Sequence, residues 1–236
     1  MNRVLEPVPV IAIDGPSGSG KGTISRAVAH TLNWGLLDSG ALYRLVALAA
    51  RRAGIGLDAA QPLADLAARF DIRFGSGPSG EEIVWLDGSE VTRDIRTEGA
   101  GNDASRVAAL PAVRAALLAR QRAFAVPPGL VADGRDMGTV VFPEARVKIF
   151  LTASLEERAL RRHKQLKEKG VAATLAALSL EIAERDKRDI SRAASPLVAS
   201  ADAVVLDTTG MSVKAVVERV LRLARGRLPP PIGQGS

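Results

Sequence analysis

Several short runs of apolar residues along the chain have the character of buried β-strands. The first, residues 8–14 (VPVIAID), is rich in β-branched residues and is followed by glycine. Similar runs cover 146–153 (RVKIFLTA) and 201–209 (ADAVVLDTT), and another ends at Asp133. Continuous apolar runs of this length are typical of strands buried on both faces, as in a parallel sheet.

Segments with helical spacing alternate with these runs. In residues 22–34, Ile24, Val28 and Leu32 recur at intervals of four, which places them on one face of a helix. Residues 35–54 contain a short strand, a turn and another helix, and a long Arg- and Lys-rich helical stretch separates the last two apolar runs. This alternation predicts an α/β fold, in which a parallel sheet is flanked by right-handed crossover helices.

The alternation breaks in the region 63–100. There the strips DIRF and EEIVWLDGSEVT lie on either side of a GSGPSG loop, which predicts a hairpin or small meander. Helical spacing returns in 105–125. We therefore expect a core of residues 8–62 and 105–228, an inserted subdomain at 63–104 and a disordered tail at 229–236.

Composition narrows the class of protein. The chain has 236 residues, of which 47% are hydrophobic and 25% charged, as in ordinary globular domains. It contains no cysteine, which excludes disulfides, thiolate metal sites and cysteine nucleophiles. No apolar run has the length of a signal peptide or a membrane span, so we expect a cytoplasmic protein without membrane contacts.

The formal net charge of +6 and the pI near 10.1 raise the question of nucleic-acid binding. Aromatic residues make up only 3% of the chain, too few for a platform on which bases of a single strand stack. The arginines are instead expected to converge on the phosphates of small molecules, and no nucleic-acid partner is expected.

The segment IDGPSGSGKGT, residues 13–23, lies between the first predicted strand and the first predicted helix. Glycines allow successive N–H groups to face one anion, and the helix N-terminus adds partial positive charge. Lys21 supplies a cation for the outer phosphates, which favours this interpretation over an ordinary surface turn. We therefore predict a phosphate-binding loop formed by Gly15, Pro16, Ser17, Gly18, Ser19, Gly20, Lys21, Gly22 and Thr23.

The loop departs from the general pattern in one respect. That pattern has a hydroxyl residue directly after the lysine, whereas here Gly22 intervenes before Thr23. The guanine-reading tetrapeptide Asn-Lys-x-Asp of GTPase switches does not occur in the chain. A transferase, which needs a second anionic substrate, is therefore favoured over a switch.

Arginines are concentrated where a second phosphorylated substrate would bind. Arg135 and Asp136 directly follow a strand end, which is where ligands bind in such sheets. The remaining arginines occur at helical spacing, which is also typical of solvated helices with local ion pairs. They are Arg158, Arg161 and Arg162 in one segment, and Arg185, Arg188 and Arg192 in another.

With these residues assembled, the sequence resembles the bacterial cytidylate kinase family. The matching segments are IDGPSGSGKGT, LLDSGALYR, IRTEG, ADGRDMGTVVFP, VKIFLTAS, ERDKRD and ADAVVLDTT, in the order of the family. The resemblance implies a P-loop NTPase-like fold that transfers the γ-phosphoryl group of ATP to CMP or dCMP with Mg²⁺. It also implies a monophosphate-binding insertion at 63–104 and a mobile lid near 154–166.

The resemblance further implies residue roles. It assigns the loop Gly15–Thr23 to ATP, and Thr23 and Asp133 to Mg²⁺, the latter through water. It assigns Ser39 and Arg44 to the monophosphate nucleotide, Ser105, Arg114 and Asp136 to cytosine, Arg135 and Arg192 to the acceptor phosphate, and Arg185 and Asp189 to the sugar. The implied catalytic residues are Lys21, Arg135, Arg158, Arg162 and Arg192.

Two other functions stay open at this point. One is a different small-molecule kinase, acting on UMP or on a hydroxyl acceptor. The other is a nucleic-acid-binding ATPase, suggested by the pI. We expect a monomer, and the sequence does not decide between CMP and dCMP.

Overall fold

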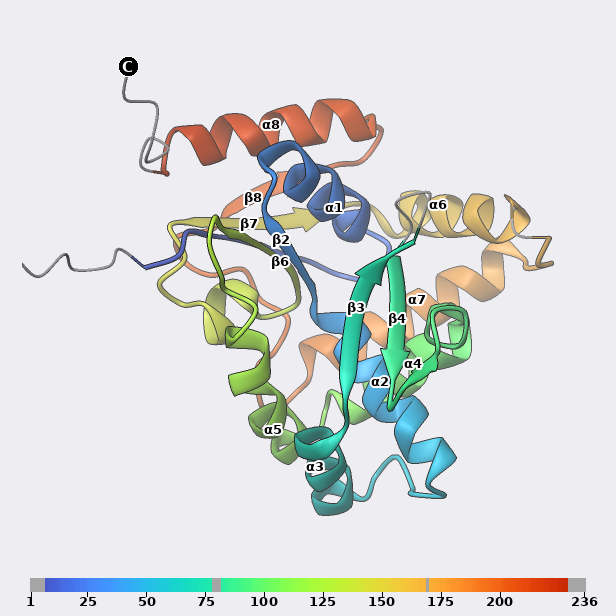
Figure 1. Ribbon diagram of the computed structural model, residues 1–236. Helices are drawn as coiled ribbons and strands as arrows, with labels where there is room; N and C mark the ends of the chain where they lie inside the picture. Colours follow the sequence, from blue (N-terminus) through green and yellow to red (C-terminus); the bar gives the residue numbers. More distant parts are fainter. Residues whose placement is uncertain (1–6, 78–81, 169, 229–236) are drawn as a thin grey trace, which may run out of the picture. The chain divides into compact units, whose positions relative to one another are not determined.

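The computed structural model describes residues 7–77, 82–168 and 170–228 (Figure 1). These residues form two compact units. The first contains the chain up to Asp38, Arg122–Ser191 and the chain from Ser195 onward, and the second contains Ser39–Gln121 and Arg192–Ala194. The expected tail at 229–236 and the end of the GSGPSG loop lie outside the described residues. Within the described ranges, no helix has the length and hydropathy that crossing a bilayer requires.

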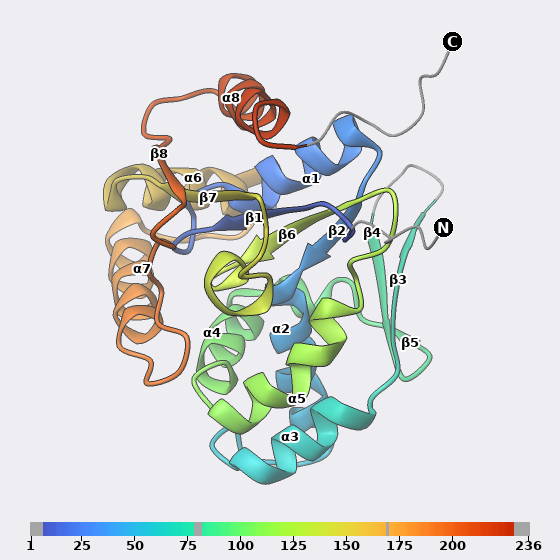
Figure 2. The ribbon, with the colours of Figure 1, turned by 90° about the vertical axis from the view of Figure 1, so that its left-hand side faces the viewer.

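The first unit is built on a five-stranded sheet with the order β2-β6-β1-β7-β8, in which every pairing is parallel (Figures 1 and 2). This confirms the parallel sheet predicted from the apolar runs. All residues of β1 and β6 are buried, as strands covered on both faces must be. The strands are β1 (Val10–Asp14), β2 (Gly35–Asp38), β6 (Leu130–Gly134), β7 (Val147–Thr152) and β8 (Val204–Asp207).

The register brings acidic residues to one edge of this sheet. Asp133 of β6 pairs with Ile13 of β1 on one side and with Asp38 of β2 on the other, and Asp14 pairs with Gly134. Three neighbouring strands therefore carry a carboxylate at or next to their last residue, at the same edge. In open parallel sheets, this is the edge at which ligands bind.

Helices α1 and α8 cover one face of the sheet (Figure 2). Ile24 and Val28 of α1 and Val216 and Val220 of α8 belong to one hydrophobic core with the strands. The spacing of four in the first predicted helix is thus the spacing of its buried face. The helices of this unit are α1 (Lys21–Leu32), α6 (Leu155–Glu168), α7 (Leu175–Ile190) and α8 (Val213–Arg225), with a π-helical turn η2 (Met137–Val141) after β6.

The second unit combines helices with a small antiparallel sheet of order β3-β4-β5. Ile72 pairs with Leu86 and Phe74 with Val84, which confirms the hairpin predicted around the GSGPSG loop. The proposed insertion 63–104 lies within this unit. Its elements are α2 (Ser39–Arg52), α3 (Ala60–Arg69), β3 (Ile72–Ser76), β4 (Glu82–Leu86), β5 (Ser89–Glu90), the 3₁₀ turn η1 (Asp94–Arg96), α4 (Glu98–Val107) and α5 (Pro111–Arg122).

The helical spacing expected across 105–125 is divided between two helices. Helix α4 ends at Val107, and α5 begins at Pro111. Proline has no N–H to donate and is favoured at the first position of a helix, so a new helix starts there.

Candidate active site

The segment predicted to bind phosphate forms a loop between β1 and α1. Gly18 and Gly20 have φ of 76° and 90°, in the left-handed region that glycine adopts without strain. A Cβ on Gly15 would overlap the carbonyl oxygen of Leu151 in the neighbouring strand β7. The glycines are therefore required by the path of the backbone, which ends at the N-terminus of α1, where N–H groups and the helix dipole attract anions.

Lys21, the first residue of α1, lies inside this loop. Its side chain is buried, and Nζ donates a hydrogen bond to the carbonyl oxygen of Pro16 at 3.0 Å. Burial, followed by the nearby charge of Arg135, lowers the pKa of Lys21 to about 7, although Asp133 opposes the shift. A buried ammonium with the guanidinium groups of Arg135 and Arg185 nearby is suited to hold a polyphosphate, whose negative charge would stabilise the charged form of Lys21.

Asp133 lies against the start of α1. Its Oδ2 would be 3.2 Å from a Cβ placed on Gly22. This contact offers a reason for the glycine between Lys21 and Thr23, because a side chain there would press on the carboxylate. Among the described residues, no group of three or more His, Cys, Asp and Glu side chains is arranged to hold a metal alone. One carboxylate beside a phosphate loop nevertheless fits Mg²⁺, which binds few carboxylates and takes its other ligands from phosphates and water.

Arg135 follows β6 and pairs with α7. Its Nε donates to Oδ2 of Asp189 at 2.9 Å, and the Asp189 side chain is only 1% exposed. Burial lowers the pKa of the Arg135 guanidinium, but the charge and hydrogen bond of Asp189 outweigh it, so the net shift is upward. Arg135 therefore stays charged, held toward the same region as Lys21.

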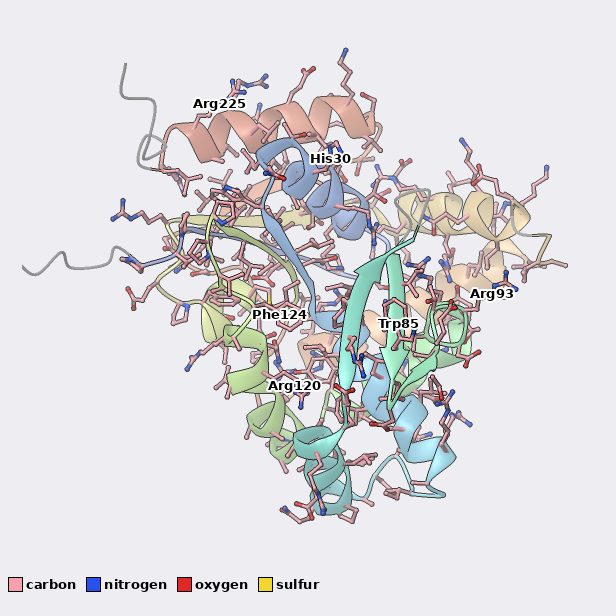
Figure 3. All side chains as sticks on the ribbon, viewed as in Figure 1. His30, Trp85, Arg93, Arg120, Phe124 and Arg225 are labelled. Carbon is pink, nitrogen blue, oxygen red and sulfur yellow. The ribbon has the colours of Figure 1, made fainter. Side chains whose placement is uncertain are left out.

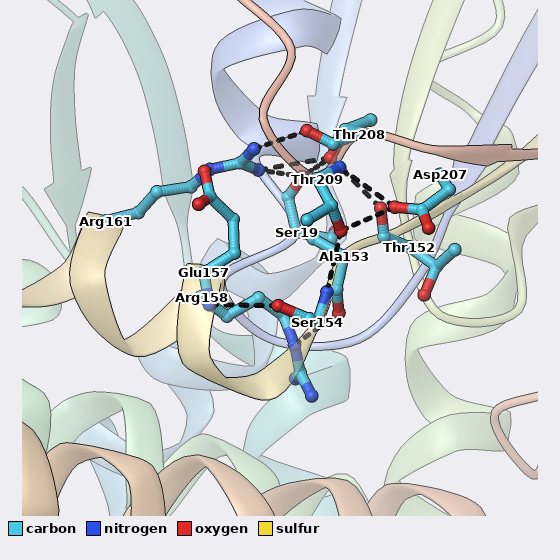
Figure 4. A network of polar contacts seen from close by, with 10 residues as sticks. All are labelled: Ser19, Thr152, Ala153, Ser154, Glu157, Arg158, Arg161, Asp207, Thr208 and Thr209. Carbon is cyan, nitrogen blue, oxygen red and sulfur yellow. Dashed lines mark hydrogen bonds and ion pairs between the residues drawn. The ribbon is translucent and has the colours of Figure 1, made fainter.

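Two arginines of α6 donate hydrogen bonds to the backbone of the phosphate loop, and Figure 4 shows the contact of Arg161 with Ser19. Nη1 of Arg158 donates to the carbonyl oxygen of Ser17 at 3.0 Å and to Asp186 of α7 at 2.5 Å. Arg161 donates from Nη1 to the carbonyl oxygen of Ser19 at 3.3 Å and from Nη2 to that of Thr208 at 2.6 Å. The beginning of α6 is thereby tied to the loop.

Arg162, the next residue along α6, makes one of its contacts within the helix. Its Nη1 donates to Oε1 of Gln165 at 3.1 Å, on its own helix. The catalytic roles that the resemblance implies for Arg158 and Arg162 stay predictions, and the structure adds Arg161, which donates to the loop backbone as Arg158 does. A helical turn of 3.6 residues brings positions three apart nearly as close as positions four apart, so spacing alone could not show which of these arginines reach the loop.

Asp14 is a buried acid at the end of β1 that the sequence analysis did not single out. Its Oδ1 accepts a hydrogen bond from the backbone N of Met137 and its Oδ2 from that of Gly138, both at 2.8 Å. Burial raises the pKa of Asp14 to about 7, although these two hydrogen bonds oppose the shift. Its place directly before the loop was the only signal in the sequence.

In the second unit, the predicted residue Arg114 is held by a backbone hydrogen bond and by a contact with an aromatic ring. The side chain is buried, Nη1 donates to the carbonyl oxygen of Ala108 at 3.1 Å, and the guanidinium lies 5.5 Å from the centre of the Tyr43 ring. Ser39, at the start of α2, and Ser105, on α4, are also buried. Arg120 of the same unit lies 5.0 Å from the Phe70 ring (Figure 3).

The other predicted residues are described here by the element that carries each of them and by their burial. Asp136 is buried immediately before η2, Arg185 lies on α7 near enough to Lys21 to lower its pKa, and Thr23 is exposed in the first turn of α1. Arg44 lies on α2, half-buried, and Arg192 is buried directly after α7. His30 lies exposed on α1 (Figure 3).

Comparison with known proteins shows which family the chain belongs to. Residues 11–226 match the family model described as cytidylate kinase. The chain is 57% identical over 221 residues to a cytidylate kinase of Nitrosococcus oceani, covering 93% of this chain and 97% of that one. It is 59% identical over 217 residues to a cytidylate kinase of Pseudomonas aeruginosa, covering 91% and 94%. Among solved structures, it aligns with a gluconokinase from Sinorhizobium meliloti at a TM-score of 0.45 and 18% identity, covering 94% of both chains.

Proposed function

The chain belongs to the cytidylate kinase family, and from that premise we propose how its residues carry out the family's reaction. The reaction transfers the γ-phosphoryl group of ATP to CMP or dCMP, giving CDP or dCDP and ADP. The match across residues 11–226, with Lys21 inside an intact phosphate loop, is the observation that carries this conclusion.

On the ATP side, we propose that the loop Gly15–Thr23 holds the phosphates through its N–H groups. Lys21 then exchanges its bond to Pro16 for the outer phosphates, which return it to the charged form. Asp133, through water, and Thr23 would hold Mg²⁺, which would neutralise charge on the phosphates as it builds up. Thr23 lies exposed in the first turn of α1, and Asp133 lies against that turn from β6.

On the acceptor side, we propose that Arg135 and Arg192 hold the phosphate of CMP. The ion pair between Arg135 and Asp189 supports this role, because it keeps a charged guanidinium in a fixed orientation. We assign the base and sugar contacts as the family pattern suggests. They are Ser105, Arg114 and Asp136 for cytosine, Arg185 and Asp189 for the sugar, and Ser39 and Arg44 for the rest of the nucleotide.

The proposed chemistry needs no strong general base. A phosphate oxygen of CMP is ionised at neutral pH and attacks the γ-phosphorus directly, with ADP as the leaving group. Positioning and charge stabilisation by Lys21, Arg135 and Arg192 then supply the catalysis, joined by Arg158 and Arg162 of the proposed lid near 154–166. Closure of that lid would exclude water, which would otherwise consume ATP.

We also propose that the protein acts as a cytoplasmic monomer without a nucleic-acid partner. The low aromatic content supports the last point, because base stacking needs aromatic side chains. Filter binding to RNA at physiological salt would test it, and a retained complex would return the nucleic-acid-binding ATPase to consideration.

An acceptor panel is the decisive test of the substrate. ADP release is coupled to a reporter reaction and measured with CMP, dCMP, UMP, AMP and a sugar hydroxyl acceptor. We expect the highest kcat/KM with CMP or dCMP. A preference for UMP or for the hydroxyl acceptor would overturn the proposed acceptor, while Lys21→Ala serves as the inactive control for phosphoryl transfer.

A further inference from the structure

The turn after β6 carries two residues with proposed acceptor roles, Arg135 and Asp136. This turn leads directly into η2, whose first N–H groups have no partner within a helical turn. The residue just before a helix usually satisfies such groups with its own side chain. Asp136 occupies that position, with a φ of −145°, but its side chain makes no capping hydrogen bond.

Asp14 performs the capping instead, from a different strand. Its two carboxylate oxygens accept from Met137 and Gly138, which lie 123 and 124 positions further along the chain. Only 6% of the Asp14 residue is exposed. Because Asp14 satisfies the turn, the carboxylate of Asp136 is not drawn back onto the backbone of its own turn.

The turn after β6 is packed closely around the carboxylate of Asp14. A Cβ on Gly138 would lie 3.4 Å from Oδ2 of Asp14 and 3.2 Å from Cγ and Cδ of Lys148. The ammonium of Lys148 pairs with Asp202 at 2.9 Å, so Lys148 presents its methylene groups to Gly138. The turn is therefore packed against the carboxylate of Asp14 and against the methylene groups of Lys148, which leave it little room to shift.

We propose that Asp14 is a positioning residue for the acceptor nucleotide. By holding the turn after β6, it fixes the orientation of Arg135 and Asp136. The inference rests on the proposed function, because it acts through the acceptor roles assigned to these two residues. It adds to that function a residue that touches neither substrate.

The first test is Asp14→Asn, which keeps the shape of the side chain. An amide has one oxygen acceptor, and its NH₂ group would face a backbone donor, so one of the two hydrogen bonds is lost. We expect the KM for CMP to rise about tenfold and the CMP to UMP ratio of kcat/KM to fall about tenfold, with the KM for ATP nearly unchanged. An unchanged ratio, or equal changes for all substrates, would overturn the proposal.

A double-mutant cycle tests whether Asp14 acts through Asp136. If it does, Asp14→Asn added to Asp136→Asn should change the CMP to UMP ratio little beyond the single variants. If the two substitutions instead lower the CMP to UMP ratio by factors that multiply, Asp14 does not act through Asp136, and the proposal is contradicted.

Two further variants separate positioning from general loss of stability. Val220→Ala removes two buried methyl groups on α8, in a core cluster that includes no residue of η2, and serves as a control variant with reduced stability in urea. It should leave the CMP to UMP ratio unchanged. Gly138→Ala keeps the carboxylate but places a methyl group 3.2 Å from the Lys148 chain and 3.4 Å from Oδ2 of Asp14. We expect the turn to shift by a few tenths of an ångström to relieve this contact and the CMP to UMP ratio to change as in Asp14→Asn. If Asp14→Asn does not fold, Gly138→Ala decides, and an unchanged ratio there overturns the proposal.

Failure of the inference can be told from failure of the proposed function. If the unaltered chain does not prefer CMP over UMP, the proposed function fails before any variant is made. Hydrogen exchange of the Met137 and Gly138 amides reports on the turn without any substrate. Faster exchange in Asp14→Asn with an unchanged CMP to UMP ratio would show that Asp14 caps the turn but does not position the acceptor.

Discussion

The guanidinium of Arg161 donates from Nη2 to the carbonyl oxygen of Thr208 at 2.6 Å, while Nη1 reaches the carbonyl oxygen of Ser19 in the phosphate loop at 3.3 Å. One side chain of α6 therefore joins the loop to the segment that follows β8 (Figure 4). Nε also pairs with Glu157 at 2.8 Å, which holds the guanidinium in this orientation. Arg161 is therefore anchored by the loop, by the segment after β8 and by its own helix at once.

The anchors of Arg161 and the catalytic role proposed for Arg162 predict different kinetic effects when each of these two adjacent arginines is removed. Arg161→Ala should raise the KM for ATP several-fold and lower the Tm, because the loop and the β8 segment lose a shared donor. Arg162→Ala should instead lower kcat by at least about tenfold with little change in KM for ATP, as for an arginine that acts on the transition state. Steady-state kinetics and thermal unfolding of both variants test this, and matching profiles for the two would contradict it.

Gly22 offers a test of the proposed Mg²⁺ contact. A Cβ there would lie 3.2 Å from Oδ2 of Asp133, whereas alanine itself favours the helix by roughly 0.5–1 kcal/mol. Gly22→Ala should therefore keep or raise the Tm while the Mg²⁺ concentration for half-maximal activity increases several-fold.

The control for this variant is Gly99→Ala. Gly99 lies in α4 of the second unit, and a Cβ there would meet nothing within 4 Å. It should change neither the Mg²⁺ requirement nor turnover. Equal Mg²⁺ requirements in Gly22→Ala and the unaltered chain would remove Asp133 from the proposed metal contact.

The lowered pKa of Lys21 predicts proton uptake when ATP binds. With a pKa of about 7, Lys21 is already charged in the empty protein below pH 7 and becomes neutral above it. Bound phosphates favour the charged form, so ATP binding at about pH 8.5 should take up close to one proton, and at about pH 6 almost none. ATP affinity should accordingly weaken as the pH rises above 7.

Calorimetry in two buffers with different ionisation enthalpies measures this uptake. Lys21→Met serves as the control, because it has no titrating group and should bind MgATP without the uptake at high pH. The same variant should have lost nearly all turnover while still binding CMP. Proton uptake that persists in Lys21→Met would assign the effect to another group.

Asp136 should enforce the rejection of UMP. Cytosine carries an amine donor where uracil carries a carbonyl acceptor, and a carboxylate accepts from the first but repels the second. Asp136→Asn offers both a donor and an acceptor, so the CMP to UMP ratio of kcat/KM should fall at least tenfold, about 1.4 kcal/mol. If Asp136 only pairs with an arginine, both substrates should lose kcat/KM in equal proportion.

The sequence by itself determined the strands, the first helix and the phosphate loop. These features depend on residues close together in the chain. The run at 8–14 is apolar because β1 is buried on both faces, and the glycines recur because the backbone must turn tightly before Lys21. The family motifs then indicated the reaction, since their order along the chain needs no coordinates to be recognised.

The tertiary structure alone decided which side chains meet. The bonds from Met137 to Asp14 and from Arg135 to Asp189 join residues that lie 123 and 54 positions apart, and no local pattern encodes such pairings. It likewise brought Arg161 to the loop, because helical spacing alone does not show which side chain of α6 reaches the carbonyl oxygen of Ser19. Folding brings these groups together through burial of the sheet, and polar contacts of this kind are therefore visible only in the folded chain.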